Sequence, residues 1–144
     1  MPGWKLHNDW AVKIGIERKV ANRVNYLEDL PHIPDTDWFH GYIPDHHPTV
    51  EEMQKEGLDY LKAWILHLII DEVETQLWEG CALDEIQKSI LNYDFWRRHN
   101  SYEPIDPSLM QKCPNEIATI LKFVKDNIDE IIMDIKARST ILNT

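Results

Sequence analysis

The sequence predicts an all-α fold, a compact bundle of about five helices around a central buried helix over about residues 50–79. Three observations predict this class. Several segments place apolar residues at the spacing of one helix face. Residues that start and stop helices flank these segments, and none has the alternating pattern of a strand. The 144 residues, 43% hydrophobic and 28% charged, fit a single domain over 1–144.

The first two helical patterns precede a proline. One covers the chain from about Asn8 to a break near Gly15, and the next runs from Glu17 to Leu30. The second pattern has a clear apolar face, made of Val20, Ala21, Val24 and Leu27. We expect Pro31 to end it, because proline has no backbone N–H and clashes with the preceding helical turn.

The segment 31–48 is the least regular part of the sequence, with four prolines. Loops longer than about 12–15 residues in compact domains are usually functional or disordered. We expect this loop to be ordered, because Trp38, Phe39, Tyr42 and Ile43 can anchor it to a core. The loop also concentrates four of the seven histidines and three aspartates: His32, His40, His46, His47, Asp35, Asp37 and Asp45.

The central helix is predicted from a capping box to a glycine. Thr49 can accept a hydrogen bond from the N–H three residues on, while the Glu52 side chain reaches back. The helix is predicted to run to about Glu79, with Gly80 as its left-handed C-terminal cap. Its middle, 61–70, is apolar around nearly the whole circumference, which predicts that other elements surround it.

Two more helices are predicted in the second half of the chain. One covers 83–99 and is followed by a turn-rich segment over 100–114. The last helix is expected to start with Asn115 as its N-cap. Its apolar stripe consists of Ile117, Ile120, Leu121, Val124, Ile128, Ile131, Ile132 and Ile135.

Charge and composition disfavour several classes of protein. The net charge of −10 repels phosphate backbones and anionic membranes, so we expect no general nucleic-acid or membrane binder. The longest strongly apolar stretch, 63–70, is far shorter than the ~20 residues of a membrane span. Cys81 and Cys113 are too few for a disulfide scaffold, and no secretory signal is recognisable. We therefore expect a soluble, cytoplasmic protein.

His67 and Asp71 are the first candidates for chemistry. They lie four residues apart on the predicted central helix, so both side chains project from one face. Metal sites in helical bundles use this arrangement, and a buried carboxylate is costly unless it is paired or metal-bound. A structural hydrogen bond between His67 and Asp71 explains the same spacing, and this alternative stays open.

Other histidines and carboxylates could complete a metal site. His99 and Glu103 repeat the four-residue spacing, and His7 begins the first apolar segment. The 31–48 loop leads directly into the central helix, so His40, His46 and His47 could fold over its face. Imidazoles and carboxylates are preferred ligands of zinc and of non-haem iron or manganese. Each of these side chains also fits a solvated surface position.

The order of these residues resembles the zinc-dependent phospholipase C and single-strand nuclease superfamily. The resemblance rests on an early histidine, the Asp/His-rich loop, HLIID at 67–71 and HNSYE at 99–103, and is best over 4–75. It implies an all-α enzyme with a zinc site between the loop and the central helix. The implied ligands are His67 and Asp71, with His7, Asp45, His46 and His99 completing the shell. Asp37 or Asp45 would be a base or metal bridge.

The resemblance implies a phosphoester substrate, small rather than polymeric because the protein is acidic. The expected cofactor is a divalent metal, with zinc favoured over iron or manganese. Two other classes stay open. A hemerythrin-like bundle also uses such His/carboxylate pairs, but to bind oxygen or iron. A non-enzymatic interaction protein would instead leave an apolar face exposed, most plausibly on the helix over 115–138.

Overall fold

The computed structural model describes residues 3–29, 47–91 and 108–143. All regular structure in these ranges is helical, which confirms the predicted all-α class. The helices are α1 (Trp4–Lys13), α2 (Arg18–Asp29), α3 (Val50–Glu56), α4 (Leu58–Trp78), α5 (Leu83–Leu91), α7 (Leu109–Lys112), α8 (Pro114–Asp126) and α9 (Ile128–Asn143). They outnumber the expected helices, partly because two predicted helices are each divided in the structure.

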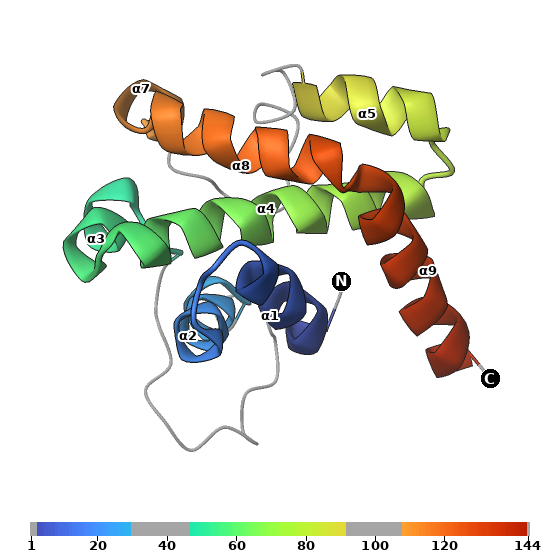
Figure 1. Ribbon diagram of the computed structural model, residues 1–144, viewed down its shortest axis with the longest axis horizontal. Helices are drawn as coiled ribbons and strands as arrows, with labels where there is room; N and C mark the ends of the chain where they lie inside the picture. Colours follow the sequence, from blue (N-terminus) through green and yellow to red (C-terminus); the bar gives the residue numbers. More distant parts are fainter. Residues whose placement is uncertain (1–2, 30–46, 92–107, 144) are drawn as a thin grey trace.

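Helix α4 packs against α1, α2, α3, α5, α8 and α9 (Figure 1). In this view α1 and α2 lie below α4, while α8 and α5 lie above it. Every residue from Ala63 to Glu74 is buried, polar residues included. A helix covered on several sides has no solvent-facing stripe, so its histidine and carboxylates have to find partners inside the protein.

The predicted helix over 50–79 is divided at Gly57. Helix α3 ends at Glu56, and Gly57 has φ +138°, outside the helical region. A glycine adopts this conformation without the steric cost that a Cβ brings. The two predicted ends are confirmed: Thr49 and Glu52 form both bonds of the capping box, and Gly80 follows α4 with φ +81°.

The break gives a testable prediction. We expect Gly57→Ala to lower the free energy of unfolding by about 1–3 kcal/mol, because alanine is strained at positive φ. Crowding adds little, since an added Cβ would lie 3.8 Å from Tyr60. Gly3→Ala is the matched control, because Gly3 has φ −66° and open space around it. Denaturant unfolding measures both variants, and equal costs would contradict the interpretation.

The predicted C-terminal helix differs at its start and in its middle. It begins at Pro114 with Cys113 as N-cap, rather than at an Asn115 N-cap, and proline is well tolerated at the first helical position. It is divided at Asn127, whose side-chain Nδ2 donates to the Phe123 carbonyl at 2.8 Å and competes with the helical pattern. The predicted stripe is nevertheless buried along its whole length, from Ile117 to Ile135.

Three other predicted boundaries can be compared. Helix α1 begins at Trp4, earlier than the expected Asn8, and α2 matches the predicted 17–30 helix closely. Helix α5 covers the start of the predicted 83–99 helix, and Ile86 is buried as expected. The rest of that helix and most of the 31–48 loop lie outside the described residues. No described helix has both the length and the apolar character of a membrane span.

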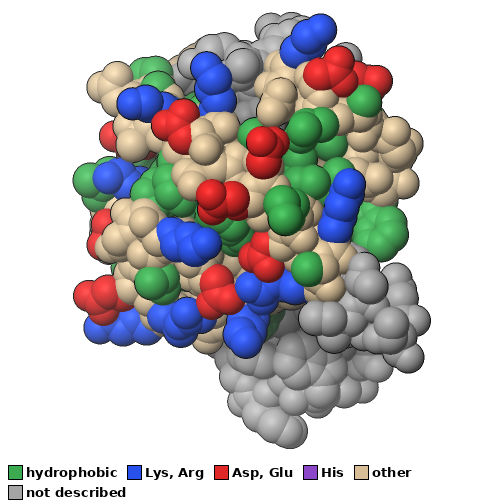
Figure 2. All heavy atoms as spheres, turned by 45° about the vertical axis from the view of Figure 1, so that its right-hand side comes forward, with side chains coloured by type: hydrophobic (Ala, Val, Ile, Leu, Met, Phe, Trp, Pro, Cys, Tyr) green, Lys and Arg blue, Asp and Glu red, His purple; other side chains and the backbone are tan. Residues whose placement is uncertain are grey.

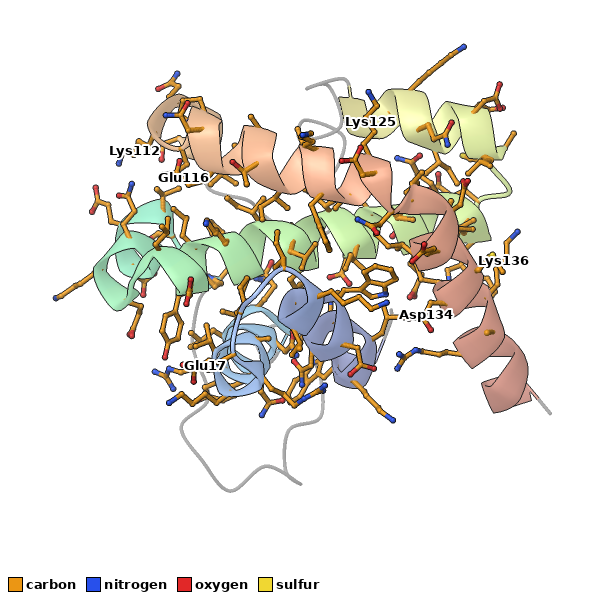
Figure 3. The ribbon with its side chains drawn as sticks, in the orientation of Figure 1. Glu17, Lys112, Glu116, Lys125, Asp134 and Lys136 are labelled. Carbon is orange, nitrogen blue, oxygen red and sulfur yellow. The ribbon has the colours of Figure 1, made fainter. Side chains whose placement is uncertain are left out.

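A polar network joins α1 to the end of the chain. Trp10 Nε1 donates to Asp134 Oδ2 at 3.0 Å, and Arg138 bonds both Asp134 and Asp9. Asp134 is marked on α9 in Figure 3. These contacts fix α1, which carries His7, relative to the C-terminal helix.

The face shown in Figure 2 mixes both signs of charge with hydrophobic side chains. No continuous basic stripe of the kind that follows a phosphate backbone is visible on it.

Candidate metal centre

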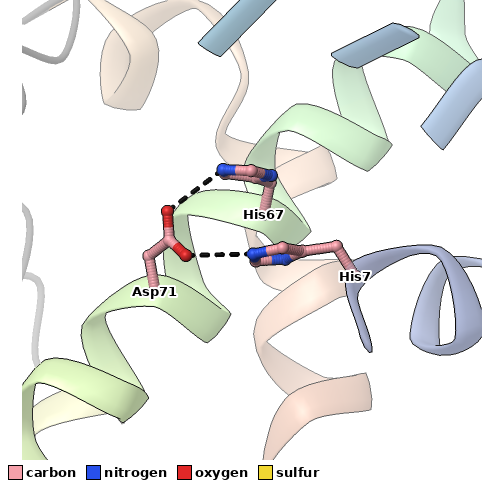
Figure 4. A group of neighbouring side chains, drawn as sticks. All are labelled: His7, His67 and Asp71. Atoms are coloured by element: carbon pink, nitrogen blue, oxygen red, sulfur yellow. Dashed lines mark hydrogen bonds and ion pairs between the residues drawn. The ribbon is translucent and has the colours of Figure 1, made fainter. Parts of the chain in front are cut away.

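Two helices bring the central three side chains together. His67 and Asp71 lie one turn apart on the same face of α4, as predicted, and His7 reaches them from α1 (Figure 4). All three are almost fully buried, with exposed fractions of 3% for His7, 1% for His67 and 4% for Asp71. The sequence therefore identified three residues that the fold assembles from distant positions.

The two imidazoles face separate oxygens of one carboxylate. His7 Nε2 lies 3.0 Å from Asp71 Oδ1, and His67 Nε2 lies 3.0 Å from Asp71 Oδ2. The rings are stacked, with centroids 3.9 Å apart and planes 14° apart. One ligand atom from each residue lies within 4.8 Å of the others, a group that could hold a metal ion.

A second carboxylate approaches the same imidazole. Asp29, the last residue of α2, places Oδ1 at 3.1 Å from His67 Nε2. Its Oδ2 accepts a hydrogen bond from Trp4 Nε1 at 2.6 Å. Sequence reasoning missed Asp29. The available signal was an acidic residue in the last turn of a helix, where the helix dipole disfavours negative charge.

Another set of polar contacts lies on the far side of His67. Its Nδ1 lies 2.9 Å from Asn25 Oδ1, and Asn25 Nδ2 donates to Asn8 Oδ1 at 2.8 Å. Sequence reasoning missed both asparagines, because polar residues on an amphipathic helix are expected on its solvated face.

Burial and neighbouring charges shift the pKa values within the site. Burial lowers the pKa of His7 below its ordinary 6.5, and the neighbouring His67 lowers it further. Burial alone would also lower the pKa of His67, but Asp71 and Asp29 outweigh it and hold that pKa well above 6.5. Burial alone would raise the pKa of Asp71, but His67 and His7 hold it below 3.8. The metal-free site thus favours a charged His67, a neutral His7 and an ionised Asp71.

These shifts predict how the stability of the metal-free protein depends on pH. The pKa of His67 is raised on folding, so its contribution is present below 6.5 and is lost as pH rises through the folded value. The pKa of Asp71 is lowered, so its contribution is present above 3.8 and is lost as pH falls through the folded value. Denaturant unfolding with a chelator, over a pH series, measures both the loss of stability at high pH (the alkaline limb) and the loss at low pH (the acid limb). We expect His67→Gln to flatten the alkaline limb; an unchanged limb would contradict this account.

His47 pairs elsewhere among the described residues. Its Nδ1 lies 3.6 Å from Glu28 Oε2, which also faces Trp64 Nε1 at 3.4 Å. Glu28 is next to Asp29 in sequence, so this pair lies at the same end of α2 as the carboxylate that contacts His67.

The other predicted site residues lie outside the described residues: His40, His46, His99, Glu103, Asp37 and Asp45. Their placement as ligands or catalytic groups stays a prediction. The described part of the candidate centre therefore consists of His7, His67 and Asp71, with Asp29 next to His67.

The chain matches no protein-family model, no curated protein and no solved structure. What the site can do is therefore argued from its donor atoms. Imidazole nitrogens and carboxylate oxygens are ligands of zinc, iron and manganese. Two histidines and one carboxylate are also the protein ligands of several catalytic zinc sites, which keep one position open for water or substrate.

Proposed function

We propose that this chain is a metal-dependent hydrolase that holds a divalent ion, preferably zinc, on His7, His67 and Asp71 and cleaves a phosphoester. One observation carries the proposal: two buried carboxylates, Asp71 and Asp29, converge on the same nitrogen of His67. No described ion pair joins either carboxylate to a lysine or arginine. A purely structural His–Asp pair needs only one carboxylate.

Charge balance supports an ion at this position. With neutral imidazoles, the two carboxylates bring two negative charges into the core, and removing each from water costs several kcal/mol. A proton on His67 compensates only one of them. A divalent cation compensates both, and it leaves each imidazole in the neutral form that binds metals.

The spacing of the donor atoms fits the same conclusion. In a tetrahedral zinc site with bonds of about 2.0 Å, neighbouring ligand atoms lie roughly 3.3 Å apart. The three nitrogen–oxygen separations around His67 and Asp71 are 3.0, 3.0 and 3.1 Å. These separations are slightly shorter than the spacing of ligand atoms around zinc, so a small outward movement of the side chains would be enough to surround an ion.

A bound divalent ion would supply Lewis-acid chemistry, lowering the pKa of a water toward ~7 and polarising a phosphoryl oxygen. His7 and His67 would hold the ion through Nε2, and Asp71 would hold it through its carboxylate. The resemblance to zinc-dependent phospholipases C and single-strand nucleases supports a phosphoester as substrate, and Asp37 or Asp45 as base or metal bridge. The net charge of −10 favours a small substrate over a polymer.

Iron is the second candidate ion, because two histidines and one carboxylate also form the ligand set of non-haem Fe(II) sites. An iron protein of this kind would bind oxygen or iron rather than hydrolyse an ester. The interaction-protein alternative is less well supported. The apolar stripe of α8 and α9 is buried, and the one large hydrophobic side chain described as exposed on these two helices is Met133, at 69%.

Hydrolysis of chromogenic phosphomonoesters and phosphodiesters tests the proposal. We expect turnover by the zinc-loaded chain, loss of turnover with a chelator, and loss in Asp71→Asn even with zinc added. Asp59→Asn is the matched control, since Asp59 is an exposed aspartate on the same helix. A zinc-loaded protein that cleaves none of these esters would refute the hydrolase assignment, and visible absorption of the purified protein would point to iron.

A further inference from the structure

The two ring nitrogens of His67 have opposite surroundings. Nε2 faces the carboxylates of Asp71 and Asp29, whereas Nδ1 lies 2.9 Å from Asn25 Oδ1. Asn25 is 1% exposed and lies one turn before Asp29 on α2. One helix thus contacts both sides of the ring.

The orientation of the Asn25 amide follows from its other partners. Its second polar atom, Nδ2, lies 3.4 Å from the Trp4 carbonyl oxygen and 2.8 Å from Asn8 Oδ1. The Trp4 carbonyl can only accept, so the atom facing it has to be the donor nitrogen. The Asn25 oxygen therefore faces His67, and His67 Nδ1 has to carry the hydrogen between them.

The hydrogen-bond chain continues with the same direction. Asn8 accepts from Asn25 through Oδ1, while its own Nδ2 faces Asn22 Oδ1 at 3.4 Å. Hydrogen bonds in one direction thus run from His67 through Asn25 and Asn8 to Asn22. Reversing one amide would place like atoms face to face at each neighbouring contact.

Trp4 orients the second carboxylate in a similar way. Its indole N–H donates to Asp29 Oδ2, which leaves Asp29 Oδ1 facing His67 Nε2. Helix α1 therefore supplies, through Trp4 and Asn8, the contacts that orient both Asn25 and Asp29 on α2. Metal-binding histidines almost always donate their other ring N–H to an oxygen acceptor, which fixes the ring and its tautomer.

We infer that Asn25 is a positioning residue that keeps a proton on His67 Nδ1 and thereby assigns Nε2 to the metal, with Trp4 and Asn8 holding the Asn25 amide in place. The assignment to a metal rests on the proposed function; the orientation of the ring does not. His7 lacks this support, because its buried Nδ1 has no hydrogen-bond partner among the described residues. Asn25 therefore acts on one imidazole of the pair.

Zinc affinity of three variants tests the inference. We expect Asn25→Leu to weaken zinc binding by roughly 10–100-fold, the usual loss when such a partner is removed. Asn25→Asp keeps an oxygen acceptor for Nδ1–H but places its second oxygen against the Trp4 carbonyl and Asn8 Oδ1, so we expect it to recover only part of the affinity. Asn115→Leu, at an exposed asparagine on α8, is the control and should bind like wild type. Wild-type affinity in Asn25→Leu would overturn the inference and leave the proposed function intact.

Nitrogen and proton NMR of the His67 ring, in metal-free protein, separates the two claims. We expect a slowly exchanging Nδ1–H signal in wild type and in Asn115→Leu, and its loss or fast exchange in Asn25→Leu. If wild type binds no zinc, the proposed function fails, and this signal alone decides the role of Asn25. The same signal in wild type and Asn25→Leu, or none in wild type, would overturn that role.

Discussion

Zinc at about 100 times its dissociation constant is expected to raise the melting temperature of the wild-type chain by roughly 5–10 °C, and Asp71→Asn is expected to abolish this rise. Such a zinc excess stabilises the folded state by about 2.7 kcal/mol, and each kcal/mol is worth roughly 2–4 °C at this chain length. Asp71 contacts both imidazoles of the site, so its replacement removes the group that links His7 to His67. Thermal unfolding by circular dichroism, with zinc and with a chelator, measures the effect.

Two controls accompany this measurement. Asp59→Asn removes an equal charge from the exposed first turn of α4 and should keep the full zinc response. The chelated Asp71→Asn protein should still show cooperative unfolding, which separates loss of the site from loss of the fold. An equal zinc response in wild type and Asp71→Asn would place the ion elsewhere.

Trp64→Ala is expected to lower the free energy of unfolding by about 3–5 kcal/mol, the usual cost of truncating a buried large aromatic side chain. Trp64 is 1% exposed, and its indole N–H faces Glu28 Oε2 at 3.4 Å. The substitution thus leaves a cavity in the core and removes a donor from the buried Glu28 carboxylate. Urea unfolding at fixed pH measures the loss.

Trp78→Ala is the matched control on the same helix. Trp78 is 64% exposed, and we expect its truncation to change stability by less than about 0.5 kcal/mol. Similar losses in both variants would contradict the placement of α4, because they would require equal burial at its middle and at its end.

The sequence predicted the fold class well because the signals were local. The capping box at Thr49, the cap at Gly80 and the stripe over 117–135 each depend on a few neighbouring residues, and the structure confirms them. The two helix breaks were missed because no local signal in the sequence marks them. Glycine at 57 and asparagine at 127 occur inside helices elsewhere, so composition alone does not say that the chain turns there.

The site was partly predictable. His67 and Asp71 share a helix, so their spacing alone placed them on one face. His7 was predicted only as one of several candidate histidines, because it reaches His67 and Asp71 through the packing of α1 on α4. Asp29 and Asn25 could not be identified, because their role depends on the angle at which α2 crosses α4. Hydrophobic periodicity predicts which face of a helix is buried, but not which residues of another helix pack against that face.

The most direct test of the metal centre is elemental analysis of the chain, purified without a histidine tag and dialysed against zinc. The account predicts a stoichiometric divalent metal in wild type and in Asp59→Asn, and its loss in both His67→Ala and Asp71→Asn. Protein that stays metal-free after dialysis would contradict the account, and the contacts of Asp71 with His7 and His67 would then be a hydrogen bond and an ion pair of the core.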